Sequence, residues 1–120
     1  MSRIVFLSYI SNMQQNIEII LTSVDNREAA NSMADALVEK GLAACVQISA
    51  AGQSVYRWQG ETMHDAEYYL CIKTSRARAN ETATWLTTHH PYDEPEIVRL
   101  DGEASPGYLA WLETQTRHPG

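Results

Sequence analysis

Hydrophobic positions along the chain alternate between a spacing typical of strands and one typical of helices. Residues 17–22 (IEIILT) are apolar at nearly every position and rich in β-branched side chains, which predicts a central strand of a sheet. Apolar residues then recur three and four positions apart, which predicts a helix over residues 26–40. Asp25 followed by Glu28 is a helix-capping signal, and Gly41 is a typical helix end.

The middle of the chain predicts a long antiparallel hairpin. Residues 44–49 form one expected strand, and residues 54–58 continue it after an interruption that ends at Gly52. Gly60 supplies the turn, and residues 67–74 (EYYLCIKT) alternate in hydrophobicity as a returning strand does. Both arms are long for so small a domain, so we expect the hairpin to extend beyond its sheet.

The last third of the chain predicts two helices and one strand. A second helix is expected over residues 76–89, capped by Ser75, and a fourth strand over residues 96–100. Ser105 and Pro106 mark the start of a last helix. The resulting order is β-α-β-β-α-β followed by a helix. It predicts an α+β fold of the ferredoxin-like type, with an antiparallel sheet and two helices on one face.

The length of 120 residues is typical of a single domain, which we place at residues 17–117. Residues 1–16 form an N-terminal extension, expected either to be disordered or to add a short edge strand over residues 4–7; Met13 is an alternative start. The apolar run at residues 4–7 is far shorter than the roughly 20 residues that span a bilayer. We therefore expect a cytoplasmic protein with no membrane partner.

The charge balance narrows the classes of partner. The chain has 15 acidic and 9 basic residues, for a formal net charge of −6. Nucleic-acid binders and proteins that dock on anionic membranes need a basic surface, so neither partner is expected. Two cysteines are too few for a disulfide framework, which favours a reducing compartment.

Candidate chemistry centres on two adjacent histidines. The chain has none of the common nucleotide-binding or hydrolase motifs, so we expect no catalytic activity. His89 and His90 offer imidazole nitrogens, which suit copper, zinc or nickel, and an acidic segment from Asp93 to Glu103 follows them. Adjacent residues at a helix end point about 100° apart, so the alternative is that each histidine makes its own structural contacts.

Several short stretches, in order and at the expected spacing, resemble the CutA divalent-cation tolerance proteins. The resemblance runs from about Ile17 to Arg117. The stretches are AACV at 43–46, SVYRWQG at 54–60, Glu67 leading to IKT at 72–74, HPY at 90–92 with PE at 95–96, and Tyr108, Leu109 and Trp111.

The resemblance implies a ferredoxin-like subunit similar to the PII signalling proteins. It also implies a tight homotrimer in which the hairpin arms pair with neighbouring subunits, and an association with copper and other divalent metals but with no known catalysis. In some members a cysteine on the first strand and the histidine pair are assigned to copper. The pair is present here as His89 and His90, whereas the cysteine position holds Leu21, so one soft thiolate ligand is lost.

Two functions follow as hypotheses. The first is a trimeric cytoplasmic divalent-cation tolerance protein that binds copper or another divalent cation at His89 and His90, without an obligatory cofactor. The alternative is a PII-like signalling or scaffold trimer that binds a small anion or a partner protein in clefts between subunits. The residues expected in such a cleft or interface are Tyr56, Trp58, Glu67, Lys73, Tyr92 and Glu96.

Overall fold

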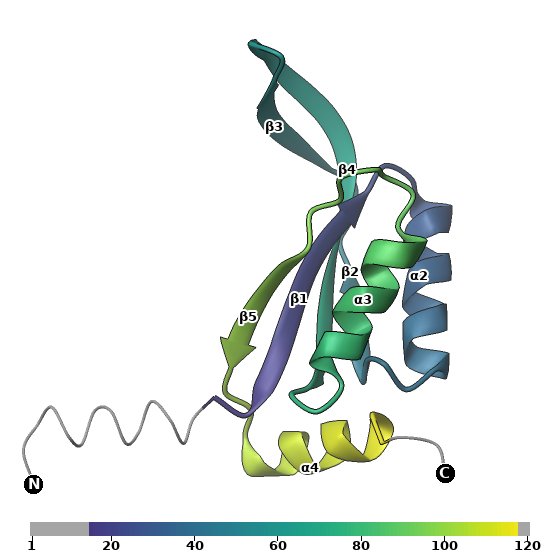
Figure 1. The fold of residues 1–120 in the computed structure, drawn as a ribbon, viewed down its shortest axis with the longest axis vertical. Helices are drawn as coiled ribbons and strands as arrows, with labels where there is room; N and C mark the ends of the chain where they lie inside the picture. Colours follow the sequence, from purple (N-terminus) through teal and green to yellow (C-terminus); the bar gives the residue numbers. More distant parts are fainter. Residues whose placement is uncertain (1–14, 118–120) are drawn as a thin grey trace, which may run out of the picture.

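The structure is a computed structural model that describes residues 15–117. Its elements follow the predicted order (Figure 1). They are β1 (Ile17–Val24), α2 (Arg27–Glu39), β2 (Cys45–Ile48), β3 (Gly52–Trp58), β4 (Glu61–Ser75), α3 (Ala79–His89), β5 (Val98–Gly102) and α4 (Pro106–Gln115). The suggested strand at residues 4–7 and the alternative start at Met13 lie outside the described residues. No helix within residues 15–117 is long and apolar enough to cross a membrane.

The main sheet has the strand order β2-β4-β1-β5, and every neighbouring pair is antiparallel. Figure 1 shows α2 and α3 side by side on the same face of this sheet. The main core lies between the sheet and these helices; its largest fully buried members are Ile20, Leu37, Leu70, Ile72 and Leu86. The ferredoxin-like α+β fold is therefore confirmed.

The ends of α2 show how local sequence sets an element's bounds. The side chain of Asn26 accepts a hydrogen bond from the backbone N–H of Ala29 at 2.8 Å, so Asn26 rather than Asp25 is the N-cap. Gly41 has φ +69°, a left-handed conformation that costs glycine little, and the backbone N–H of Leu42 donates to the carbonyl of Leu37. The predicted helix end is confirmed.

The hairpin is longer than predicted. Residues 68–75 of β4 pair with β1, whereas residues 61–67 pair with β3 and carry the hairpin away from the main sheet (Figure 1). We call residues 52–67 the arm. Its tip is a two-residue turn at Gln59 and Gly60, both with positive φ. Residues 61–66 are mostly polar, so their alternation gave no strand signal, and the prediction began the strand at Glu67.

The start of α3 and the bounds of β5 differ from the sequence prediction. Residues 76–78 form a turn, and the hydroxyl oxygen of Ser75 accepts from the backbone N–H of Arg78 at 3.3 Å. Ser75 therefore closes this turn, and α3 starts only at Ala79. The last strand covers residues 98–102 rather than 96–100, because its pairing with β1 continues to Gly102.

The second face of the sheet is only partly covered. Cross-strand partners share a face, so Ile19 with Leu100 and Leu21 with Val98 lie opposite the helices. The helix α4 packs against Ile17 and Ile19 at one end of this face. Val98 and Leu100 remain exposed beyond it. We call the part of this face outside α4 the open face.

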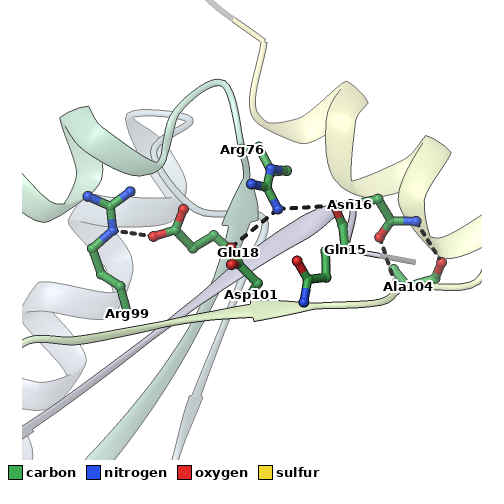
Figure 2. A network of polar contacts seen from close by, with 7 residues as sticks. All are labelled: Gln15, Asn16, Glu18, Arg76, Arg99, Asp101 and Ala104. Carbon is green, nitrogen blue, oxygen red and sulfur yellow. Dashed lines mark hydrogen bonds and ion pairs between the residues drawn. The ribbon is translucent and has the colours of Figure 1, made fainter. Parts of the chain in front are cut away.

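A polar network fixes the entry of the chain into β1 (Figure 2). The side chain of Asn16 donates to the carbonyl of Ala104 at 3.2 Å and accepts from its N–H at 2.8 Å. Arg76 donates to the carbonyl of Gln15 and to Asp101. These contacts join the start of β1 to the end of β5 and to the segment that leads into α4.

Candidate functional site

His89 lies on the exposed last turn of α3. Its ring stacks on the Trp85 ring, with centroids 4.4 Å apart and planes 16° from parallel. Nδ1 lies 2.9 Å from the carbonyl oxygen of Trp85. A carbonyl can only accept, so Nδ1 carries a proton, and in the neutral ring Nε2 keeps its lone pair. His89 can therefore offer a metal ion one nitrogen.

His90 is buried and both of its ring nitrogens are used. The backbone N–H of Tyr92 donates to Nδ1 at 3.0 Å, so Nδ1 is unprotonated and Nε2 donates to the carbonyl of Ser23 at 2.9 Å. Burial lowers the pKa of His90 below its ordinary value near 6.5, and the Ser23 bond and the charge of Glu67 oppose this shift only in part. His90 is therefore neutral near pH 7.

These contacts do not form a chelating pair. His90 would have to give up a hydrogen bond to bind a metal, and within residues 15–117 no three histidine, cysteine or acidic side chains are arranged around one position. A metal on His89 would need its remaining ligands from outside residues 15–117, for example from solvent or from another chain. The two histidines of the predicted metal site thus have different surroundings and different chemistry.

The cysteines lie near the position where the resemblance implied a thiol. Leu21 pairs across the β1–β4 ladder with Cys71. Cys45 pairs with Lys73 on the other side of β4, so both thiols are on the face that carries Leu21. Both cysteines are free and half-buried. A thiol is therefore present next to Leu21, but on the adjacent strand.

Two concavities lie where the arm leaves the sheet. The first, which we call the arm cleft, has a volume of about 790 Å³. It is lined by Ser23, Ser54, Val55, Tyr56, Trp58, Met63, Glu67, Tyr92, Asp93, Glu94 and Glu96. The second, the acidic hollow, has a volume of about 570 Å³ and is lined by Asp25, Tyr56, Asp65, Ala66, Glu67 and Tyr92. Both volumes are in the range of small-molecule sites.

Five of the six residues expected in a cleft or interface meet in the arm cleft. They are Tyr56, Trp58, Glu67, Tyr92 and Glu96. The structure does not bring Lys73 to them: its ammonium lies over the ring of Tyr108 from α4, 5.9 Å from the ring centre. Lys73 is on the β4 segment that pairs with β1 and β2, away from the arm.

Both concavities are lined by Tyr56, Glu67 and Tyr92, and the polar groups of these residues set the polarity of the two surfaces. The hydroxyl of Tyr56 donates to Asp65, and that hydrogen bond raises the pKa of Tyr56. The hydroxyl of Tyr92 points to Glu67 over a longer distance of 3.5 Å. Burial first, and then the charges of Glu67 and Asp25, raise the pKa of Tyr92. Both hydroxyls therefore stay protonated near neutral pH.

Sequence reasoning missed two of the three carboxylates of the acidic hollow. Asp25 was interpreted only as a helix cap, although the N-cap is Asn26. Asp65 precedes the strand predicted from Glu67, whereas in the structure it lies two positions before Glu67 on the same face of β4. The i, i+2 spacing of Asp65 and Glu67 was the signal that could have found the hollow, once residues 61–66 were recognised as a strand.

The structure is that of a small ferredoxin-like protein with an acidic cleft beneath a projecting hairpin. A family profile described as CutA1 divalent ion tolerance protein matches residues 18–115. The chain belongs to this family, and the resemblance drawn from its sequence is confirmed.

Known proteins agree in sequence and in structure. The divalent-cation tolerance protein CutA of Thermus thermophilus is 42% identical over 100 residues, which cover 82% of this chain and 97% of that protein. The chloroplastic protein CutA of Arabidopsis thaliana is 37% identical, over 83% of this chain but only 56% of that longer protein. The structure of CutA from Synechococcus elongatus superimposes with a TM-score of 0.81 at 36% identity, covering 86% of this chain and 92% of that chain.

Proposed function

We propose that this chain forms a cytoplasmic homotrimer that acts in divalent-cation tolerance by binding and not by catalytic turnover. The observation that carries the proposal is the uncovered apolar surface of the single chain. Leu100 and Val98 on the open face are exposed, as are Val55, Tyr56 and Trp58 on the arm. A two-stranded arm is at best marginally stable alone, and contiguous exposed apolar patches mark interfaces.

A second copy is the occupant that this surface fits. The strand β4 runs from the main sheet into the arm, where it pairs with β3, so a partner docked on the open face can extend along the same strand to the arm. The arm cleft lies between them, and a neighbouring chain docked on the arm would close it from solvent. The number of three copies rests on the resemblance to the CutA family.

Divalent-cation binding through His89 is the finer part of this proposal. His89 is exposed, its Nε2 keeps a lone pair in the neutral ring, and the acidic side chains that follow α3 add negative potential. We assign His90 a structural role and not a metal-binding one, because both of its ring nitrogens already have hydrogen-bond partners. Copper is the favoured metal, since imidazole is a good copper ligand.

Calorimetric titration with Cu(II) tests this assignment. His89→Ala is expected to raise the dissociation constant at least tenfold, whereas His90→Gln, which keeps the donor to Ser23, is expected to change it little. His64→Ala is the matched control, because His64 is an exposed histidine on the arm. Equal affinities of the wild type and His89→Ala would contradict the metal assignment.

The gathering of five expected cleft residues favours a second candidate function, the binding of a small ligand in the arm cleft and the acidic hollow. This is the PII-like signalling or scaffold role. The sequence suggested a small anion as one ligand for such a cleft. The lining disfavours an anion, because every charged residue that lines the two concavities in the described part of the chain is acidic.

A further inference from the structure

The arm leaves the main sheet at a bulge next to Tyr69. The strand β4 pairs with β3 up to Glu67 and with β2 from Leu70 onward. The three residues 49–51, which join β2 to β3, therefore lie opposite only two residues of β4, Tyr68 and Tyr69. An extra residue on one side of a ladder bends the strand and increases its twist. The bulge accounts for the change of direction between the main sheet and the arm (Figure 1).

The side chain of Ser49 stabilises this bulge. The backbone N–H of Ser49 donates to the carbonyl of Tyr69 at 2.9 Å, as in a regular ladder. The return bond is different, because the N–H of Tyr69 donates to the hydroxyl oxygen of Ser49 at 2.9 Å, and that hydroxyl donates to the carbonyl of Ala50 at 2.8 Å. The backbone after Ser49 can therefore leave the ladder while the N–H of Tyr69 keeps an acceptor.

The side chain of Tyr69 spans the bulge from the sheet to the arm. Its hydroxyl lies 3.2 Å from the hydroxyl of Ser54 on β3, within hydrogen-bond distance. Its ring lies against Gly52, so closely that a Cβ at position 52 would stand 2.5 Å from Cε2 of the ring. Glycine is the residue that allows such a close approach of the backbone. Because Tyr69 itself pairs with Ser23 of β1, its side chain connects the start of β3 to the main sheet.

The direction of the arm decides how copies of the chain can assemble. In the proposed homotrimer, other copies cover the apolar side chains of the arm, such as Val55 and Trp58, and those of the open face, Val98 and Leu100. The arm and the open face are different surfaces, so a contact between the arm of one copy and the next copy is of the head-to-tail kind. Such contacts close into a ring only at a suitable rotation, and otherwise they give open chains of copies.

We propose that Tyr69 is a positioning residue for assembly, which holds the arm in the direction that closes three copies into a ring. The proposal rests on the proposed function, because it presupposes the homotrimer. The contacts of the Tyr69 side chain with Gly52 and Ser54 are the observations that carry it. Both contacts lie within one chain, so they are made whether or not a neighbouring copy covers this surface.

Light scattering after size exclusion tests the proposal on the intact protein, with urea unfolding as the measure of subunit stability. Gly52→Ala places a methyl group where the ring lies, and Tyr69→Ala removes the ring. Each is expected to lower the share of protein in the three-chain species to less than about half of the wild-type share. Tyr69→Phe keeps the ring against Gly52 and is expected to retain the three-chain species. Gly52→Ala keeps the test valid if Tyr69→Ala fails to fold.

Two matched controls separate the direction of the arm from subunit stability. Gly107→Ala adds a methyl group into open space on α4. Tyr68→Ala removes an equal ring from the opposite face of β4, where that ring packs against the main core, and is expected to lower the free energy of unfolding. Both controls are expected to retain the three-chain species. The double variant of Gly52→Ala and Tyr69→Ala should lose no more of it than Tyr69→Ala alone, because the added methyl group clashes with the ring.

The outcomes separate the role of Tyr69 from the homotrimer itself. A wild type with the mass of one chain would contradict both. A three-chain wild type whose mass is unchanged in Gly52→Ala and Tyr69→Ala would overturn the role of Tyr69 alone. An equal loss of the three-chain species in Tyr68→Ala would show that assembly follows subunit stability, and it would also overturn that role. A double variant in which the two losses simply add would overturn the contact between Gly52 and the ring as its basis.

Discussion

The Nδ1 atom of His90 and the backbone N–H of Tyr92 are joined by a hydrogen bond of 3.0 Å. The two rings also meet edge to face, with centroids 4.9 Å apart. Because Tyr92 lines both the arm cleft and the acidic hollow, a residue first considered as a metal ligand positions a cleft residue. The histidine pair thus divides into an exposed potential ligand, His89, and a buried positioning residue.

The two hydrogen bonds of His90 make a graded series of variants informative. His90→Ala removes both and is expected to lower the free energy of unfolding by about 1–3 kcal/mol. His90→Asn keeps an acceptor near Nδ1, and His90→Gln keeps a donor near Nε2, so each should lose less. Urea unfolding measures the series, and an alanine variant as stable as the wild type would contradict the assigned role.

The lowered pKa of His90 predicts a specific dependence of stability on pH. The unfolded chain takes up a proton near the ordinary value of 6.5, whereas the native chain takes it up only at lower pH. The stabilisation is therefore fully present above about pH 6.5 and is lost as the pH falls from there through the native pKa. The free energy of unfolding of the wild type, measured by urea unfolding at several pH values, should fall over this range, whereas that of His90→Gln should not. Parallel pH profiles of the two proteins would contradict the role of His90.

Two buried threonines share one acceptor beneath α3. The hydroxyls of Thr74 and Thr82 lie 2.7 and 2.6 Å from the carbonyl oxygen of Leu42 and can donate to it, although the single proton of Thr82 can also go to the carbonyl of Arg78 at 2.9 Å. Each single change to valine leaves the other donor in place and should cost about 1 kcal/mol. The double variant should lose more than the sum of the two, because the buried carbonyl then has no donor. Simple additivity in a double-mutant cycle would show that the shared acceptor is unimportant.

The two ion pairs of Figure 2 are expected to contribute differently to the free energy of unfolding. Glu18 is nearly buried and pairs with Arg99, whereas the side chains of Arg76 and Asp101 are both about half exposed. Arg99→Met leaves a buried carboxylate without its partner and should destabilise by about 1–2 kcal/mol. Asp101→Asn should cost less than about 1 kcal/mol. Urea unfolding compares the two, and a reversed order would refute this ranking.

The sequence predicted the fold well because strong local signals agreed with one another. The apolar run from Ile17, the spacing before Gly41 and the alternation after Glu67 each specify one element, and their order admits few topologies. The extra length of β4 was missed because its arm segment is polar on both faces. A strand of this kind gains its stability from pairing and assembly, which leave little pattern in one sequence.

The candidate site was predictable in part. Tyr56 and Trp58 drew attention as aromatic residues on a hairpin, and both line the arm cleft. The partners of His90 were not predictable, because the carbonyl of Ser23 comes from a segment 67 residues away. Lys73 shares a strand face with Glu67, but the length of β4 separates the two ends of that face.

Assembly through the open face is the central claim, and the molar mass of two matched variants in solution tests it most directly. Leu100 on the open face and Val38 on α2 are both 45% exposed, so aspartate at either position adds the same charge to an exposed apolar site. Light scattering after size exclusion should give three times the 13.5 kDa of one chain for the wild type and for Val38→Asp. Leu100→Asp should shift the protein toward a single chain. A wild type with the mass of one chain, or Leu100→Asp with the unchanged mass of the wild type, would contradict the account.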